Sequence, residues 1–186
     1  SETYERRLED IFQVQDEIAA AIVAKLRIEL APREQALAVR DKAPTQNVQS
    51  YELYLQGRAA WKRRGEDNLK KAIDLYQRAI GLDPGFARAH AALASAYVVL
   101  PGYTREEGDE AQFLRLAETS ARQALSLDPN IGEAHAVLAQ MNAQRGDLLD
   151  AESGFFFAIS LEPNDPTPHH WYSLLLNRVG RIDRAL

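Results

Sequence analysis

The chain has 186 residues and carries 22 basic and 27 acidic side chains, for a formal net charge of −5. This acidic balance argues against nucleic-acid binding by this segment, because a nucleic-acid surface needs a strong basic excess. The absence of cysteine excludes disulfides and thiolate metal sites. No apolar run approaches the roughly 18 residues of a membrane-spanning helix, so no span is expected in this segment.

Residues 1–31 have the pattern of an amphipathic helix. Apolar side chains recur at steps of three and four residues, and Ala31-Pro32 ends the pattern because proline cannot continue a helix. We expect this helix to pack on the helices that follow or on a preceding domain. The alternative is that it pairs two chains in a homodimer, through Leu8, Ile11, Ile18 and Ile22. Residues 32–49 are charged and polar, which predicts a short helix followed by a linker.

Beyond residue 50 the chain repeats one short junction. Leu-Asp-Pro occurs at 82–84 and at 127–129, Leu-Glu-Pro occurs at 161–163, and a histidine follows each proline by six residues. Proline biases the residue before it away from the α region, so each junction ends one helix and sets the turn into the next. Pro129 and Pro163 are 34 residues apart, whereas Pro84 and Pro129 are 45 apart. The unit is therefore 34 residues long, with 11 residues inserted once.

A 34-residue helix–turn–helix period, with small residues at fixed places and a closing proline, resembles the tetratricopeptide repeat (TPR) family. The small residues are Gly57 in the first unit and Ala139, Ala151 and Ala158 in the third. The resemblance implies an all-α fold, a right-handed TPR-type helical solenoid of antiparallel helix pairs preceded by the N-terminal amphipathic helix. The array would cover residues 50–186, with repeats at about 50–84, 85–129, 130–163 and an incomplete 164–186.

Two repeats depart from the regular length. The first has three extra residues, which we expect between its two helices, around Lys62 to Asn68. The second carries the 11-residue insertion, and proline and glycine in Pro101 to Glu110 predict a loop there. In the fourth, Pro166 predicts a helix start, and residues 181–186 match only the first turn of a second helix. We therefore expect further repeats or a capping helix after residue 186.

The amino-acid sequences of two segments indicate a more specific family than the repeat pattern does. Residues 1–23 and Tyr54-Leu-Gln-Gly-Arg58 resemble a region of bacterial multidomain signalling proteins. In that family the region follows a TolB-like domain and precedes TPR units, and the effector is a winged-helix domain, a class III adenylyl cyclase or a Ser/Thr kinase. The resemblance implies a regulatory segment whose effector lies outside this chain. We expect a cytoplasmic location, or a periplasmic one if the parent protein has an upstream membrane span.

No catalytic constellation emerges from the sequence. It contains no glycine-rich phosphate loop, no Gly-x-Ser-x-Gly elbow and no His-Glu-x-x-His helix. His90, His135 and His169 occupy the same place in successive repeats, too far apart for one metal ion to bridge, so we interpret them as packing residues. We expect no enzyme activity, no catalytic residue, no metal site and no cofactor.

A candidate binding surface follows from the resemblance, because the first helix of each TPR unit lines the inside of the superhelix. The residues placed there are Tyr51, Tyr54, Arg58, Trp61 and Lys62 in repeat one, Arg88 and Ser95 in repeat two, Gln140 and Gln144 in repeat three, and His170, Asn177 and Arg178 in repeat four. TPR domains that bind acidic chaperone tails carry lysine and asparagine at two of these positions. Here Ala91 with Ser95 and Ala136 with Gln140 stand in those places, which argues against such a clamp.

The aromatic and basic set of repeat one could hold an extended or helical peptide by stacking and charge-assisted hydrogen bonds. The competing interpretation is that the N-terminal helix folds back and covers it. The predicted function is a non-catalytic protein–protein interaction or intramolecular regulatory TPR module of a bacterial signalling protein. Its partner would be a protein or peptide, or another domain of the same protein. The alternative is a structural spacer or homo-oligomerisation element acting through the N-terminal helix.

Overall fold

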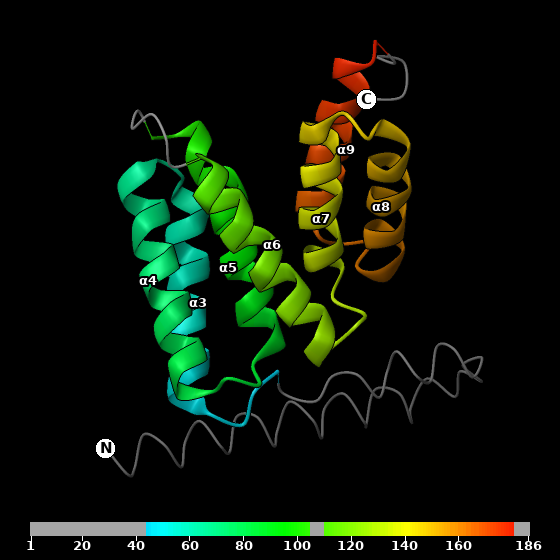
Figure 1. Ribbon diagram of the computed structural model, residues 1–186. Helices are drawn as coiled ribbons and strands as arrows, with labels where there is room; N and C mark the ends of the chain where they lie inside the picture. The colour runs from blue at the N-terminus through cyan, green and yellow to red at the C-terminus, as the bar shows by residue number, and fades with distance from the viewer. Residues whose placement is uncertain (1–43, 105–109, 181–186) are drawn as a thin grey trace, which may run out of the picture.

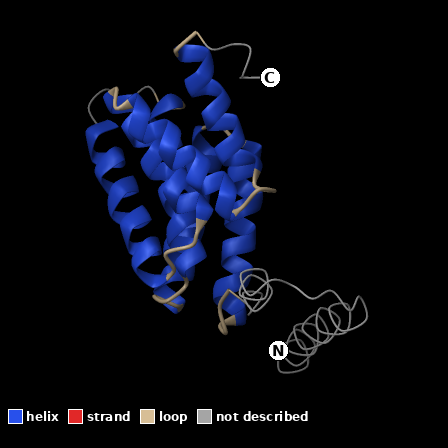
Figure 2. Cartoon of the chain, turned by 90° about the vertical axis from the view of Figure 1, so that its right-hand side faces the viewer, coloured by secondary structure: helices blue, strands red, loops and turns tan. Residues whose placement is uncertain are grey.

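The structure, a computed structural model, describes residues 44–104 and 110–180 (Figure 1). That part of the chain contains helices joined by short loops and no strand (Figure 2). The predicted helix over 1–31, most of the linker over 32–49 and the start of a second helix at 181–186 lie outside the described residues. The helices are α3 (Val48–Arg63), α4 (Glu66–Leu82), α5 (Ala87–Val99), the 3-10 helix η1 (Leu100–Gly102), α6 (Glu110–Leu127), α7 (Gly132–Arg145), α8 (Leu148–Leu161) and α9 (Pro166–Arg178).

The helices pack in consecutive pairs that form a solenoid. α3 pairs with α4, α5 with α6 and α7 with α8, and α9 packs on both α7 and α8 (Figure 1). Successive pairs are joined where the second helix of one pair packs on the first helix of the next, α4 on α5, α6 on α7 and α8 on α9. The first helices also contact one another, α5 with α3 and α7, and α7 with α9. These first helices therefore run as a continuous layer through the array, which is the layer expected to line the inner face.

The start of α3 is tied to the end of α4 by polar contacts. The side chain of Asn47 accepts a hydrogen bond from the backbone N–H of Ser50 at 2.9 Å and so caps the helix. Asn47 Nδ2 also donates to the carbonyl of Leu82 at 3.2 Å, and Thr45 Oγ1 donates to the carboxylate of Asp83. Because of this cap, residues 48 and 49 belong to α3 rather than to the predicted linker.

The three extra residues of repeat one do not form a longer loop, contrary to the prediction. The turn between α3 and α4 is the two-residue Arg64-Gly65, matched in repeat three by Gly146-Asp147. The extra length lies in α4, which has 17 residues where α8 has 14. Two features explain the longer helix: the acidic Glu66 and Asp67 in its first turn complement the helix dipole, and Leu69 is fully buried.

The insertion of repeat two begins where its proline predicts. α5 ends at Val99, Pro101 lies in η1, and α6 begins at Glu110 and runs for 18 residues. In repeat four, Pro166 is the first residue of α9, and the side chain of Asp165 caps this helix by accepting from Thr167 N at 2.8 Å.

Small residues allow the helices to approach closely. The expected alanines of repeat three, Ala139, Ala151 and Ala158, are all buried. Gly57 in α3 lies against the buried ring of Tyr76 in α4, and a Cβ at this glycine would clash with that ring. The large core side chains fill the spaces between, and among the fully buried ones are Tyr76, Phe86 and Phe155.

The repeated histidines hold the junctions between repeats. His90 Nε2 lies 3.1 Å from the carbonyl oxygen of Pro84, His135 Nε2 lies 2.9 Å from that of Pro129, and His169 Nε2 lies 3.0 Å from that of Pro163. Each ring therefore donates a hydrogen bond back to the proline six residues earlier. This contact gives a physical reason for the recurrence of histidine beyond packing.

Candidate functional site

The predicted groove residues fall into different environments. Trp61 and Ser95 are buried in the core, so their side chains are not available at the surface. Tyr51, Tyr54, Arg58 and Gln140 are half-buried. The exposed members are Lys62, Arg88, Gln144, His170, Asn177 and Arg178.

The tyrosines of α3 pack against repeat two. The ring centroid of Tyr54 lies 5.0 Å from that of Phe86 and 6.0 Å from that of Tyr76, and Tyr51 stacks on Tyr54 at 6.1 Å. Burial raises the pKa of the Tyr54 hydroxyl to about 12. These rings therefore contribute first to the contact between the first two repeats.

An ion pair crosses from repeat one to repeat three. Arg58 Nη1 in α3 lies 2.8 Å from Glu133 Oε1 at the start of α7, and the two side chains are only 23% and 8% exposed. The Glu133 carboxylate raises the pKa of Arg58. Burial raises the pKa of Glu133, and this effect outweighs the attraction of Arg58. Arg58, a basic residue of the predicted groove in repeat one, therefore already forms an ion pair with an acid of the same chain.

Glu162 links repeat three to the neighbouring repeat two. Its Oε2 accepts the backbone N–H of Glu133 at 3.1 Å, and its Oε1 lies 3.2 Å from Arg88 Nη1 in α5. The equivalent residues of the earlier junctions are aspartates, and their shorter side chains accept bonds within their own turns, from Gly85 N and from Asn130 N. The extra methylene of glutamate lets this residue reach another helix.

A groove of about 430 Å³ lies farther along the inner layer. It is bounded by the ends of α3 and α5, the start of α6, and facing residues of α7 and α9. Three predicted residues, Gln140, Gln144 and His170, line it together. The other lining residues are Arg64, Val98, Val99, Pro101, Gly102, Tyr103, Glu110, Trp171 and Leu174.

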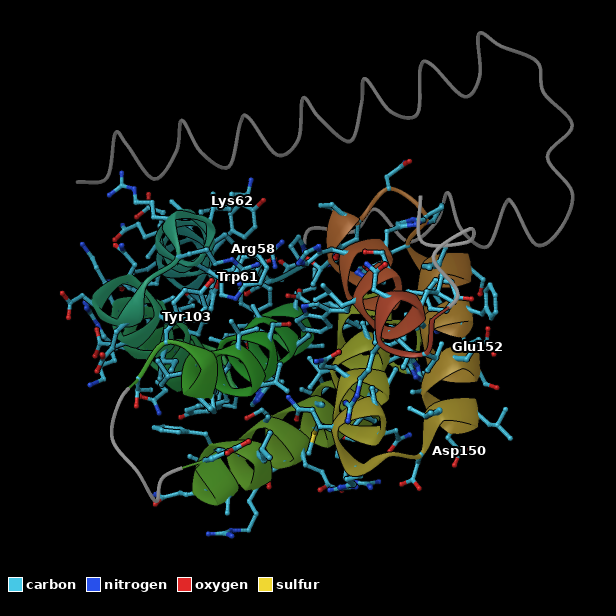
Figure 3. The ribbon with its side chains drawn as sticks, turned by 90° about the horizontal axis from the view of Figure 1, so that it is seen from above. Arg58, Trp61, Lys62, Tyr103, Asp150 and Glu152 are labelled. Carbon is cyan, nitrogen blue, oxygen red and sulfur yellow. The ribbon has the colours of Figure 1, made fainter. Side chains whose placement is uncertain are left out.

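Arg64 is one of the lining residues that sequence reasoning missed. It follows the last residue of α3 with φ 55° and ψ −178°, a region used almost only by glycine, which costs roughly 1–3 kcal/mol. Its guanidinium carbon lies 3.7 Å from the ring centroid of the buried Trp61. The only local signal in the sequence was the turn glycine, Gly65, that follows it. Figure 3 shows Trp61 on α3 and Tyr103, another lining residue, beyond the end of α5.

A second, apolar hollow of about 370 Å³ lies between α8 and α9. Its lining includes Leu148, Leu149 and Val179, which are exposed. The expectation that further helices cover this end stays a prediction. The homodimer through Leu8, Ile11, Ile18 and Ile22 also stays one, because those residues lie outside the described part.

Potential metal-ligand side chains do not cluster in the part of the chain that the structure describes. Within residues 44–104 and 110–180, no group of three or more histidine, aspartate or glutamate side chains is placed to hold a metal ion. None of the helices described there is both long and apolar enough to cross a bilayer.

No family model matches the sequence. A Rhizobium meliloti (strain 1021) protein that carries the name adenylate cyclase 3 is 35% identical over 94 residues. Those residues are 50% of this chain, but the match spans only 16% of the relative's length.

Solved structures share the architecture. A thermophilic TPR protein of Thermus thermophilus matches with a TM-score of 0.62 and 20% identity, over 94% of this chain and 86% of that one. The Sgt2 TPR domain of Aspergillus fumigatus matches with a TM-score of 0.52 and 21% identity, over 77% and 87%. The first TPR of Spaghetti (RPAP3), bound to the HSP90 peptide SRMEEVD, matches with a TM-score of 0.50 and 19% identity, over 77% and 98%. The described part of this chain therefore has the TPR fold, an all-helical solenoid.

Proposed function

We propose that this segment is a non-catalytic protein-interaction module that holds a peptide, or an extended segment of a partner protein, in the groove between α3, α5, α7 and α9. The observation that carries this proposal is the groove itself. Residues of all four repeats converge on one hollow of about 430 Å³, which lies within the range of sites that accept small ligands or a few side chains.

The lining suits a peptide in particular. Gln140 and Gln144 lie one helical turn apart on α7, and amide side chains can pair with both the N–H and the C=O of a peptide backbone. Val99, Tyr103 and Leu174, which are half-buried or exposed, offer apolar surface for a side chain. A mixed wall of this kind provides both orientation and binding energy.

The contacts near Arg58 support placing the site in this groove rather than on the aromatic face of repeat one. There the cation is matched by Glu133 and the tyrosines pack on Phe86. A partner at that face would have to displace contacts that the chain already makes. The groove lined by Gln140, Gln144 and His170 requires no such displacement.

Two similar proteins support a peptide-binding function and suggest the kind of protein to which this segment belongs. The RPAP3 structure, which shares this fold, holds a peptide. The Rhizobium relative, by its name, suggests that the parent of this segment is a bacterial signalling protein with its effector outside these residues. In that setting the array would act by binding another protein or another domain of the same chain.

A selection from a random-peptide phage library, followed by titration calorimetry of the best synthetic peptide, tests the proposal. We expect Leu174→Arg to weaken the Kd at least tenfold, because a charged side chain would enter the groove. Leu149→Arg is the matched control, since Leu149 is 80% exposed and lines the other hollow. The proposal fails if no peptide is selected, or if Leu174→Arg binds the peptide as tightly as Leu149→Arg does.

A further inference from the structure

We infer that Arg64 makes the groove selective for a peptide that presents an acidic side chain next to a bulky apolar one. This inference rests on the proposed function and names the chemistry of the ligand. It assigns the recognition of charge to a residue outside the set that the repeat pattern predicts.

The first argument is the way in which the Arg64 side chain is held. Its guanidinium lies over the Trp61 ring, at 3.7 Å from the centroid, and Trp61 itself is immobilised in the core. A guanidinium stacked by its face keeps the N–H groups along its edge for other partners. The chain accepts an unfavourable backbone conformation at Arg64, with φ 55°, while the side chain is in this position.

The second argument is charge. Arg58 pairs with Glu133, Arg88 with Glu162, and Arg145 with Glu118, each across different helices. Arg64 forms no ion pair with any carboxylate in residues 44–104 or 110–180. Burial also lowers the pKa of Arg64, which shows that its guanidinium has lost part of its hydration. A partly dehydrated cation at the edge of a groove favours an anionic ligand.

The lining identifies the anion as a carboxylate rather than a phosphate. Among the residues that the structure describes, the lining contains one arginine, Arg64, and one acid, Glu110 at the start of α6. A single guanidinium can match one carboxylate through two parallel hydrogen bonds. A phosphate group would carry up to two charges, and the second would face Glu110 with no second arginine or lysine among these described lining residues.

The remaining walls define what lies beside the acid. Val98, Val99 and Leu174 line the same hollow, and Leu174 is 48% exposed, so apolar surface is open to a ligand. Burying a large apolar side chain against it would add binding energy to that of the ion pair with Arg64. The ligand is therefore an acidic residue with a bulky apolar neighbour.

The test compares peptide selections on the wild-type chain and on Arg64→Gln. We expect aspartate and glutamate to be enriched on the wild type and not on Arg64→Gln. The best wild-type peptide should bind Arg64→Gln about 10- to 100-fold more weakly, as for loss of a charged hydrogen-bonded pair. Replacing its acid by the amide should weaken wild-type binding similarly but add little on Arg64→Gln. Arg63→Gln, at an exposed neighbouring residue, should bind like the wild type.

Arg64→Gly separates binding from folding. Glycine accepts the backbone conformation at this position, so the urea midpoint should rise or stay unchanged while affinity for the acidic peptide falls. One outcome would overturn this inference and leave the proposed function standing. In that outcome, the selected peptides contain no acid, Leu174→Arg abolishes their binding, and Arg64→Gln leaves it unchanged. A phosphoserine peptide that binds more than tenfold tighter than the same peptide with glutamate would show that the groove prefers a phosphate to a carboxylate. This result would also overturn the inference.

Discussion

Three histidine side chains support the loops between successive repeats. Each is six residues beyond a proline whose carbonyl oxygen accepts its Nε2–H, so one bond closes each turn. His135 also meets the ring of Phe157 edge-on, with centroids 4.7 Å apart. The proline ends one helix and the histidine fixes the direction in which the next one starts.

We expect His135→Ala to lower the free energy of unfolding by about 1 kcal/mol, because it removes this hydrogen bond and the ring contact. Urea denaturation followed by circular dichroism measures the change. His170→Ala is the control, since this histidine is exposed and should change stability by less than about 0.5 kcal/mol. Equal effects of the two substitutions would show that the bond to Pro129 contributes nothing.

At the scale of the element, three consecutive phenylalanines of α8 differ in their exposure to solvent. Phe155 is fully buried, whereas Phe156 and Phe157 are 55% and 49% exposed. Phe155 lies eight residues before Pro163, as Tyr76 lies eight before Pro84. Both rings fill the same place in their repeats, between small residues of neighbouring helices.

Phe155→Ala should therefore lower the free energy of unfolding by about 3–5 kcal/mol, through lost burial and the cavity left behind. Phe156→Ala, at the next residue, should cost less than about 1 kcal/mol because its side chain keeps much of its contact with water. Thermal or urea unfolding of both variants measures the two changes in the free energy of unfolding. A small effect at Phe155 would mean that the register of the third repeat is wrong.

At the scale of the whole molecule, one ion pair joins repeats that are not neighbours. A solenoid is usually held by contacts between adjacent repeats alone. Here Arg58 in α3 of repeat one reaches Glu133 in α7 of repeat three, past repeat two. The pair between Arg88 and Glu162 instead joins the neighbouring repeats two and three. The Arg58–Glu133 pair therefore ties two first helices together across the repeat that lies between them.

The buried Glu133 carboxyl predicts a particular dependence of stability on pH. Its pKa in the folded chain is raised above the ordinary 4.5, mainly by burial, so the folded state holds the proton more tightly than the unfolded state. Its contribution to the free energy of unfolding should therefore fall as pH rises from about 4.5 through the folded-state pKa. Glu133→Gln lacks this titration, so the stability of the wild type relative to this variant should decline over that range.

Glu118 provides the opposite control. Hydrogen bonds from Arg122 and Arg145 lower the pKa of its carboxyl, so its contribution should be present above about pH 4.5 and be lost as pH falls. Urea denaturation of the wild type, Glu133→Gln and Glu118→Gln at several pH values tests both signs. A wild type that gains stability over Glu133→Gln as pH rises would contradict the burial argument.

The sequence alone determined the helices and their repeating order, because these depend on local chemistry. Pro84, Pro129 and Pro163 end helices by geometry that needs no distant contact, and their spacing predicts the repeat. The resemblance to TPR units implied an inner-face position for Gln140, Gln144 and His170, and these three residues line one hollow in the structure. The extra length of repeat one was misplaced because an acidic first turn and a buried leucine extended α4 instead of its loop.

Only the tertiary structure decided which of the predicted groove residues remain available to a partner. Arg58 meets Glu133 across 75 positions of sequence because the stacking of the helices brings these side chains together. Trp61 is likewise buried in a core to which several repeats contribute. No local pattern encodes that stacking, which results from the summed packing of several helix pairs. The residue that we propose recognises charge, Arg64, lies outside the repeat positions and is defined only by the turn that follows α3.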